Sequence, residues 1–353
     1  MTLPTEPVGS IPRPKELLEG LAAFADGRIS ADGLEALYDG AVRDTLRRFE
    51  ETGSPVITDG EQRKPSFATY PIHGAGNLAP GGVTIPFADG HVRQLPVLTS
   101  GPFRYATFAA TYLEAAAKYA TRPMKEAVIA ASALSLLYPA SGIAGYPREQ
   151  FLEDLVREAQ VDIRRCLAAG ATVQIDFTEG RLAVKLDPSK ALLEAFVDLN
   201  NRVLDAFTPA EKSKIGVHTC PGGDRDSTHS ADVDYAELLP SLFRIEAGCF
   251  FVQLASEVDR PRVLKLLGAH ATGGRRVFVG VTDPISPRVE TPAEVRDRIL
   301  EAARFIDPGH LGSTDDCGFS PFGDDVSTSR DTAFAKIRAR VEGNDLASRQ
   351  LGV

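Results

Sequence analysis

Short apolar stretches rich in β-branched residues recur along the chain, and each is followed by Gly, Pro, Asp or Ser. Stretches of this length and composition predict buried β-strands. We therefore expect eight strands, whose ends read PVGS (7–10), PVITDGE (55–61), EAVIAAS (126–132), TVQIDFTEG (172–180), KIGVHTC (214–220), FFVQLASE (250–257), RVFVGVTDP (276–284) and HLGSTDD (310–316).

Helical patterns separate most of these stretches. Residues 148–169 place apolar side chains on one stripe, with Glu, Asp and Arg on the other side, which predicts an outer helix covering a sheet. The stripe consists of Leu152, Leu155, Val156, Ala159, Ile163, Cys166 and Leu167. The segment TPAE, residues 291–294, has Thr, Pro and Glu at the positions of a helix start, so another helix is expected from there to about Phe305.

The alternation of eight strands with helices predicts an α/β fold, a single (β/α)8 TIM barrel that forms one domain over residues 1–353. About 250 residues are typical of such a barrel. The excess falls mostly in an insertion around residues 62–125, where GHVRQLPVLTSGPF predicts an extra hairpin or strand. A doubly wound sheet is the rival fold, but the glycine-rich nucleotide-binding motifs of that fold do not occur.

Composition narrows the range of partners. The chain is 43% hydrophobic and 25% charged, which is typical of a globular protein, and its formal net charge is -9. An acidic chain without clustered Lys and Arg argues against nucleic-acid binding, and no apolar run is long enough for a membrane span. We expect a cytoplasmic protein with a small-molecule partner. A homo-oligomer is compatible with the sequence, and the four scattered cysteines make a poor disulfide framework.

Polar side chains gather where the predicted strands end. In a TIM barrel the active site is built at the carboxyl ends of the strands, so these residues are candidates for chemistry. They are Ser10, Asp59, Glu61, Asp176, Glu179, His218, Cys220, Gln253, Glu257, Asp283, Asp315, Asp316 and Cys317.

His218 and Cys220 lie two residues apart, so on a strand their side chains point the same way and could bind one metal ion. An H-x-C pair alone fits a core strand as well. Cys317, in DDCG at the end of the last strand, would lie across the mouth of the same barrel. Two cysteines and a histidine are the ligands of a catalytic zinc site with one open position. There the zinc would turn a thiol substrate into a thiolate, or a water molecule into a hydrolytic nucleophile.

Five segments, in order, resemble the C-terminal catalytic barrel of the cobalamin-independent methionine synthase family. They are VGSIPRP (8–14), TDGEQR (58–63), VQIDFTEG (173–180), VHTC (217–220) and DDCG (315–318). The resemblance implies that His218, Cys220 and Cys317 bind zinc. It also implies that the substrate is homocysteine.

The resemblance assigns the amino group of homocysteine to Asp176 and Glu61, and its carboxylate to Ser10 with the backbone near Val8 and Gly9. Two carboxylates can neutralise one ammonium group while the zinc takes the sulfur. Capping of the helices that follow their strands is the alternative role for Asp176 and Glu61.

Two features depart from the family pattern. Gln253 or Ala255 stands where the family has a zinc-binding glutamate. The fourth ligand could therefore be Gln253, Glu257, a solvent molecule or His229. We favour a different role for His229, that of a loop or substrate-shaping residue. The H-x-C pair with a remote cysteine also resembles the epoxyalkane:coenzyme M transferases. The chain further matches only the catalytic half of the two-barrel enzymes. The methyl donor could therefore be methyl-folate, a methylated corrinoid or protein carrier, or another electrophile.

The sequence thus predicts a zinc-dependent methyltransferase that forms methionine from homocysteine. Asp283 and either Asp315 or Asp316 are candidate acids for protonating the departing group. The alternatives are a thiol transferase that acts on an epoxide and a barrel that binds a metal or ligand without catalysis. A barrel of the uroporphyrinogen decarboxylase type shares the fold but leaves the two zinc cysteines unexplained.

Overall fold

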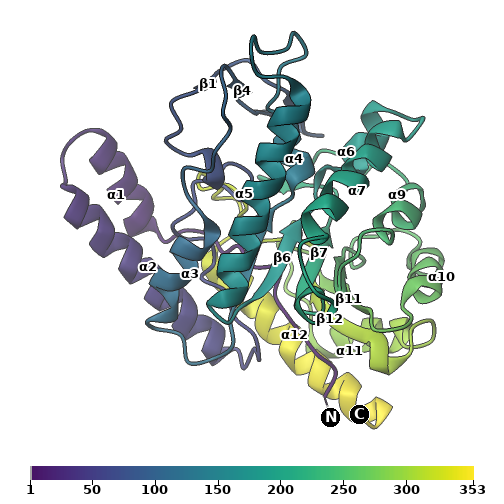
Figure 1. The fold of residues 1–353 in the computed structure, drawn as a ribbon. Helices are drawn as coiled ribbons and strands as arrows, with labels where there is room; N and C mark the ends of the chain where they lie inside the picture. Colours follow the sequence, from purple (N-terminus) through teal and green to yellow (C-terminus); the bar gives the residue numbers. More distant parts are fainter. Residues whose placement is uncertain (1) are drawn as a thin grey trace.

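The core of the protein is a parallel sheet of six strands with helices around it, as the computed structural model of residues 2–353 describes it (Figure 1). Neighbours in the sheet follow chain order from β5 to β12, with every pairing parallel. The strands are β5 (Lys125–Ile129), β6 (Thr172–Asp176), β7 (Ile215–Thr219), β10 (Cys249–Val252), β11 (Arg276–Thr282) and β12 (Leu311–Asp315).

Two irregular segments lie between the outer strands of this sheet and close the barrel. Thr5 pairs in parallel with Ser313 of β12, and Ile57 pairs in parallel with the residue before β5. The Thr58 hydroxyl donates a hydrogen bond of 2.8 Å to the Gly9 carbonyl and so joins the two segments. Six of the eight predicted strands therefore form the sheet, whereas the segments near residues 7–10 and 55–61 contribute only single bridges, the first of them at Thr5 just before the predicted stretch. The predicted TIM-barrel fold is confirmed.

Helices follow the strands and cover the outside of the barrel (Figure 1). The larger ones are α1 (Lys15–Ala25), α2 (Ala31–Glu51), α3 (Ala109–Ala117), α5 (Arg148–Ala168), α6 (Glu179–Leu186), α7 (Ala191–Leu204), α9 (Tyr235–Leu242), α10 (Arg260–His270), α11 (Pro292–Ala302) and α12 (Arg330–Leu351). Short helices α4 (Ala131–Ser135) and α8 (Pro209–Lys212) complete the connections.

Helices α5 and α11 test the sequence predictions directly. Helix α5 matches the expected outer helix, but its acidic residues are not all on the outside. Asp154 and Asp162 are buried, where Asp162 accepts the Ala109 amide at 2.7 Å. Helix α11 begins with the expected capping box of Thr291 and Glu294, and it ends three residues before the predicted Phe305.

The extra segment before β5 contains two small antiparallel pairs. β1 (Leu78–Ala79) pairs with β4 (Val97–Leu98), and β2 (Thr84–Pro86) pairs with β3 (Val92–Gln94) to form the predicted hairpin. Figure 1 places β1 and β4 at the opposite end of the molecule from both chain termini. After β7 a further hairpin follows, β8 (Gly223–Asp224) with β9 (Ser227–Thr228), and the Ala88 amide donates to the Thr228 carbonyl at 2.9 Å. The two hairpins therefore lie together at the carboxyl end of the barrel strands.

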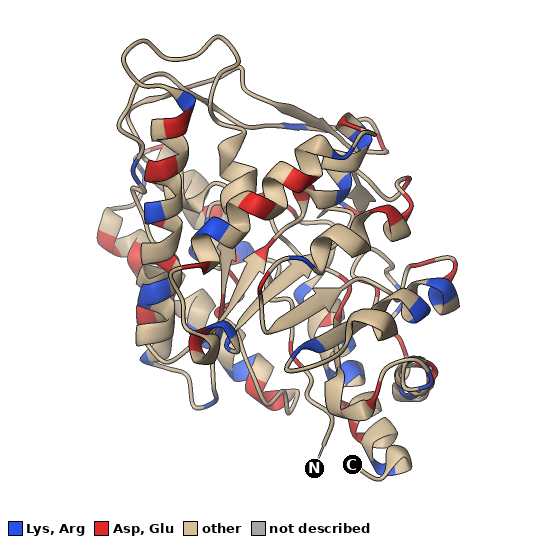
Figure 2. Ribbon diagram, turned by 45° about the vertical axis from the view of Figure 1, so that its right-hand side comes forward, with Lys and Arg blue, Asp and Glu red and all other residues tan. Residues whose placement is uncertain are grey.

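The outer surface carries both signs of charge. Figure 2 shows Lys and Arg interspersed with Asp and Glu along the helices of the visible face. Within residues 2–353 no helix has the length and apolar character needed to cross a lipid bilayer.

Candidate metal centre and substrate pocket

His218, Cys220 and Cys317 meet at the carboxyl end of the barrel. His218 belongs to β7, Cys220 follows that strand directly, and Cys317 comes two residues after β12. One ligand atom from each of the three lies within 4.8 Å of the other two. The sulfur atoms of Cys220 and Cys317 are 3.1 Å apart, and both thiols are free. The structure thus brings together the three residues that the sequence predicts as metal ligands.

The surroundings of these three residues fit a metal ion. His218 is 2% exposed, and neither of its ring nitrogens has a hydrogen-bond partner among the described residues. Buried polar atoms are normally satisfied, so two orphaned nitrogens beside two thiols need an explanation. Ligand bonds of about 2.0–2.3 Å to a common ion would place donor atoms only a few ångströms apart, as they are here. The cluster could therefore hold one metal ion with a position left for a substrate.

Glycines next to the cysteines allow this close approach. A Cβ at Gly318 would lie 2.1 Å from the Ser10 hydroxyl oxygen, and a Cβ at Gly222 would lie 1.7 Å from the His229 ring. Gly222 also has a φ of +73°, a left-handed conformation that side chains disfavour. The loops after Cys220 and Cys317 therefore need glycine to bring their neighbours against the cluster.

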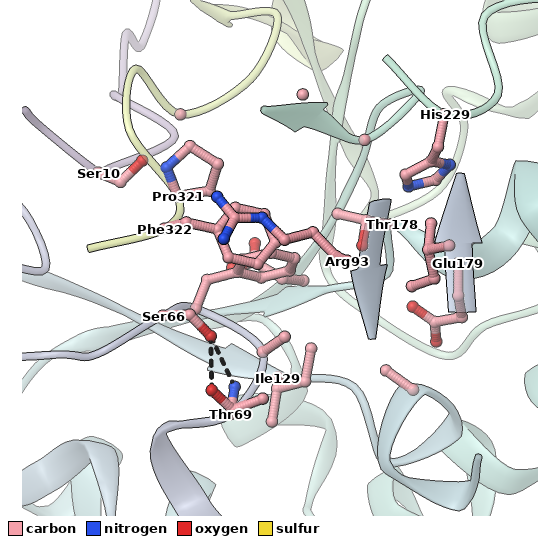
Figure 3. A pocket seen from close by; sticks show the side chains of 18 of the residues that line it. Ser10, Ser66, Thr69, Arg93, Ile129, Thr178, Glu179, His229, Pro321 and Phe322 are labelled. Atoms are coloured by element: carbon pink, nitrogen blue, oxygen red, sulfur yellow. Dashed lines mark hydrogen bonds between the residues drawn. The ribbon is translucent and has the colours of Figure 1, made fainter. Parts of the chain in front are cut away.

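A cavity of about 310 Å³ opens beside the cluster (Figure 3). In Figure 3 Ser10 and Phe322 lie on one side of it, and Glu179 and His229 lie on the other. Its polar lining includes Ser10, Glu61, Asp176, Glu179, His218 and Cys317, and its apolar lining includes Phe67, Ile85, Phe87, Ile129, Leu182 and Phe322. The predicted substrate-binding residues and two of the three predicted metal ligands therefore share one pocket with an apolar wall.

Glu61 reaches this pocket from a strained position in the backbone. Its φ is +57°, and the Asp59 carboxylate holds its amide at 2.8 Å. One carboxylate oxygen faces Lys64 at 3.5 Å, and the other is buried with no partner in the described part of the chain. Burial raises the pKa of Glu61 to about 7, although the Lys64 ammonium opposes this rise. A non-glycine residue in this conformation is typical of a functional site.

Asp176 lies next to the metal cluster because β6 and β7 are in register at Asp176 and His218. The Gln174 amide donates to Asp176 at 2.8 Å and to the Val8 carbonyl at 3.1 Å, which fixes the carboxylate against the first strand segment. Burial raises the pKa of Asp176, and the nearby His218 lowers it.

Ser10 belongs to the same end of the barrel. Its hydroxyl oxygen accepts the Ser320 amide at 3.2 Å, so the Ser10 side chain is positioned by the loop that follows Cys317.

Gln253 and Glu257, two of the candidates for the fourth ligand, make contacts outside the cluster. Gln253 accepts Arg181 at 3.1 Å and donates to Ser256 at 2.7 Å, while Glu257 forms an ion pair with the same Arg181. Neither residue belongs to the cluster of three ligand atoms. The buried Arg181 thus engages both side chains away from the cluster.

His229 lies in the pocket wall, on the loop that follows β9. Its Nδ1 atom pairs with the Ser230 hydroxyl, and its ring packs edge-on against Phe87. Burial, assisted by the Lys185 charge, lowers the pKa of His229 to about 4, so the ring is neutral at neutral pH. His229 lines the cavity, and its substrate-shaping role stays a prediction.

The predicted catalytic acids Asp283, Asp315 and Asp316 do not line the pocket, and Asp315 forms an ion pair with Arg340 at 3.0 Å. Asp316 accepts four hydrogen bonds of 2.7–2.8 Å, from the amides of residues 254 to 256 and the Ser256 hydroxyl. Asp283 accepts the Ile285 amide at 3.0 Å within its own turn. Neither residue lines the cavity, so this geometry favours structural roles for both.

No local motif assigns a role to two features of the pocket. The sequence marks Glu179 only as a polar residue at a strand end. Arg93 of the β2–β3 hairpin bridges Asp224 and Asp324 at 2.5–3.0 Å, which ties both hairpins to the loop after Cys317. No local motif marks such contacts, because the partners are more than 90 residues apart in the sequence.

Residues 3–336 match the family described as "Cobalamin-independent synthase, Catalytic domain". The chain is 26% identical to the 5-methyltetrahydropteroyltriglutamate–homocysteine methyltransferase of Nitratidesulfovibrio vulgaris, over 90% of this chain and 39% of that protein. It is 23% identical to the methionine synthase of Sulfurisphaera tokodaii, over 99% of this chain and 94% of that one.

Two solved structures have the same fold. One is a B12-independent methionine synthase from a Shewanella species in complex with selenomethionine, with a TM-score of 0.76, 18% identity and 99% coverage of both chains. The other is a B12-independent methionine synthase, described as putative, from Listeria monocytogenes, with a TM-score of 0.71, 21% identity and coverage of 98% of this chain and 99% of that one.

Proposed function

The chain belongs to the cobalamin-independent methionine synthase family, and from that premise we propose that it transfers a methyl group to the sulfur of homocysteine with a bound zinc ion. The observation that carries this proposal is the convergence of His218, Cys220 and Cys317 beside a pocket lined by acidic side chains. We also propose that the 353 residues act as one catalytic domain in the cytoplasm, where the free thiols stay reduced.

The cluster would supply the sulfur chemistry. His218, Cys220 and Cys317 would hold the zinc, and zinc bound there lowers the pKa of a coordinated thiol, so that the sulfur is a thiolate at neutral pH. Two cysteine ligands and one histidine match the ligand set of catalytic zinc sites. The hydrogen bond of Arg181 to Gln253 and its ion pair with Glu257 support a centre with three protein ligands, at which the substrate sulfur would bind.

The acidic residues would position the amino acid. Glu61 and Asp176 both line the pocket, and a substrate ammonium between them would satisfy the unpartnered oxygen of Glu61. The ammonium charge would keep both carboxyl groups ionised despite their burial. The Ser10 hydroxyl can donate to the substrate carboxylate, because its oxygen accepts the Ser320 amide and its hydrogen remains free for the pocket.

The apolar wall would receive the methyl donor. Phe67, Phe87 and Phe322 line the cavity together with Ile85 and Leu182, and they exclude water from the reacting sulfur. Exclusion of water keeps the thiolate reactive and prevents hydrolysis of the donor.

Metal analysis of a matched pair of cysteine variants tests the centre. We expect about one zinc per chain in the wild type and a loss of most of this metal in Cys317→Ser. The control is Cys249→Ser, because Cys249 lines a different cavity and is not part of the cluster. Full metal retention in Cys317→Ser would contradict the ligand assignment.

The reaction itself is tested on the zinc-loaded chain. Addition of homocysteine is expected to add one sulfur scatterer to the zinc-edge X-ray absorption spectrum, and methionine is expected when 5-methyltetrahydrofolate is also present. An unchanged zinc spectrum would contradict thiol activation. If the protein joins a thiol to an epoxide and does not transfer a methyl group, its function is that of the alternative, a thiol transferase that acts on an epoxide.

A further inference from the structure

The pocket contains a third buried carboxyl group besides Glu61 and Asp176. Glu179 is the first residue of α6, lines the cavity and is 4% exposed (Figure 3). Its Oε1 atom accepts a hydrogen bond from the Ser132 hydroxyl, whereas its Oε2 atom is buried without a partner among residues 2–353. One half of this carboxyl group is therefore fixed, and the other half has no partner, in a residue that belongs to the pocket wall.

The hydrogen bonds around Ser132 fix where a proton on Glu179 can lie. The Asn200 side-chain amide donates to the Ser132 hydroxyl oxygen at 2.7 Å. Because the amide group brings its own hydrogen, the hydrogen of the Ser132 hydroxyl is left for the bond to Oε1 of Glu179. In this arrangement Oε1 is an acceptor, which leaves the unpartnered Oε2 as the place for a proton on this carboxyl group.

The surroundings of Glu179 favour the protonated form. Burial raises its pKa to about 8, the Ser132 hydrogen bond and the Ala133 amide lower it, and the charge of Asp176 on β6 raises it. The other titratable or charged side chains that line the same cavity are Glu61, Arg93, His218, His229, Cys317 and Asp324. Glu179 differs from Glu61 in having no lysine beside it, so it is the acid in this pocket best suited to stay neutral at pH 7.

We propose that Glu179 is the general acid of the methyl transfer, donating its Oε2 proton to the leaving atom of the methyl donor. This inference rests on the proposed function. A metal held by His218, Cys220 and Cys317 would favour loss of the thiol proton to solvent. The sulfur then forms a bond to the methyl carbon, the bond from that carbon to the leaving atom breaks, and its electron pair stays on the leaving atom. That atom takes the Glu179 proton, and solvent later reprotonates the carboxylate.

A proton donor at this position specifies the class of methyl donor. A leaving nitrogen or oxygen needs a proton to depart as a neutral molecule, whereas a sulfide leaving a sulfonium ion does not. The geometry therefore favours donors that carry the methyl group on a basic atom. The two acids predicted from sequence are less suited to this step, because Asp283 and Asp316 do not line the cavity.

The variant Glu179→Gln separates proton transfer from hydrogen bonding. Its amide oxygen can still accept the Ser132 hydroxyl, and its NH2 group can still donate into the pocket, but it cannot give up a proton. With 5-methyltetrahydrofolate and homocysteine we expect kcat to fall by about 10² to 10⁴-fold, the contribution typical of a general acid, with KM for homocysteine nearly unchanged. The control Glu153→Gln, an exposed position on α5, should keep wild-type kinetics.

Two measurements distinguish a general acid from a merely structural residue: the pH dependence of kcat and the infrared band of the Glu179 carboxyl group. Wild-type kcat should fall as the pH rises through about 8, and the residual kcat of Glu179→Gln should lack this limb. In infrared spectra with 13C-labelled glutamate, the wild type at pH 7 should show a protonated carboxyl band that Glu179→Gln lacks.

The outcomes distinguish the two proposals. A carboxylate band from Glu179 at pH 7, or wild-type kcat in Glu179→Gln, overturns the general acid while methyl transfer by the wild type still supports the proposed function. A wild type without methyl transfer, although it binds zinc and homocysteine, overturns the proposed function and the role of Glu179 together.

Discussion

Replacement of Asp316 by Asn is expected to destabilise the fold by about 3–6 kcal/mol, because it removes acceptors from a loop that the carboxylate organises. One Asp316 oxygen accepts the amides of Leu254 and Ala255, and the other accepts the amide and the hydroxyl of Ser256, all at 2.7–2.8 Å. Asparagine offers one oxygen and one NH2 group, so two of the four donors lose their partner. A hydrogen bond to a charged group contributes about 1.5–3 kcal/mol, which gives this range for two.

Urea unfolding of the zinc-loaded protein measures this loss as a lower midpoint at unchanged slope. Asp283→Asn is the matched control, because Asp283 accepts one amide, that of Ile285, and should lose less than about 1.5 kcal/mol. Zinc content is determined in both variants, since Cys317 follows Asp316 directly. An Asp316→Asn protein with wild-type stability and a large loss of kcat would refute this reasoning and restore Asp316 as a catalytic acid.

Three further results are expected. Gly318→Ala should weaken homocysteine binding by at least about tenfold in calorimetry, because its Cβ would lie 2.1 Å from the Ser10 hydroxyl; unchanged affinity would contradict this. Lys64→Met should cost about 3–5 kcal/mol in denaturation, because Glu126, 2.7 Å from Lys64, would be left as an unpaired buried charge; Lys64→Met/Glu126→Gln should recover part of it. Glu61 has a pKa of about 7 in the folded protein, above its unfolded value of 4.5, so its contribution to stability is full below pH 4.5 and is lost as the pH rises through 7. In thermal unfolding, the stability of Glu61→Gln should therefore depend less on pH between 4.5 and 7 than that of the wild type.

Local patterns in the sequence were sufficient for the barrel. Apolar runs that end in polar residues marked the six strands of the sheet, because a strand buried on both faces needs a continuous apolar stretch, and two further runs lie at or next to the bridges that close the barrel. Alternation along β7 placed His218 and Cys220 on one side, and the position of Cys317 after the last strand placed it at the same barrel end. The capping box of Thr291 and Glu294 likewise follows from four adjacent residues. Each of these features depends on neighbours in the chain.

The partner of each polar side chain was decided only by the tertiary structure. Glu257 is bound by Arg181 from 76 positions away, and Asp316 holds amides about 60 positions away. The Ser132 contact to Glu179 likewise joins two connections of the barrel. Burial of an apolar face can be predicted from the periodicity of apolar residues, because it requires only that the buried positions are apolar. A hydrogen bond needs one donor at one place, and the closing of the barrel brings that donor in from a distant strand or helix.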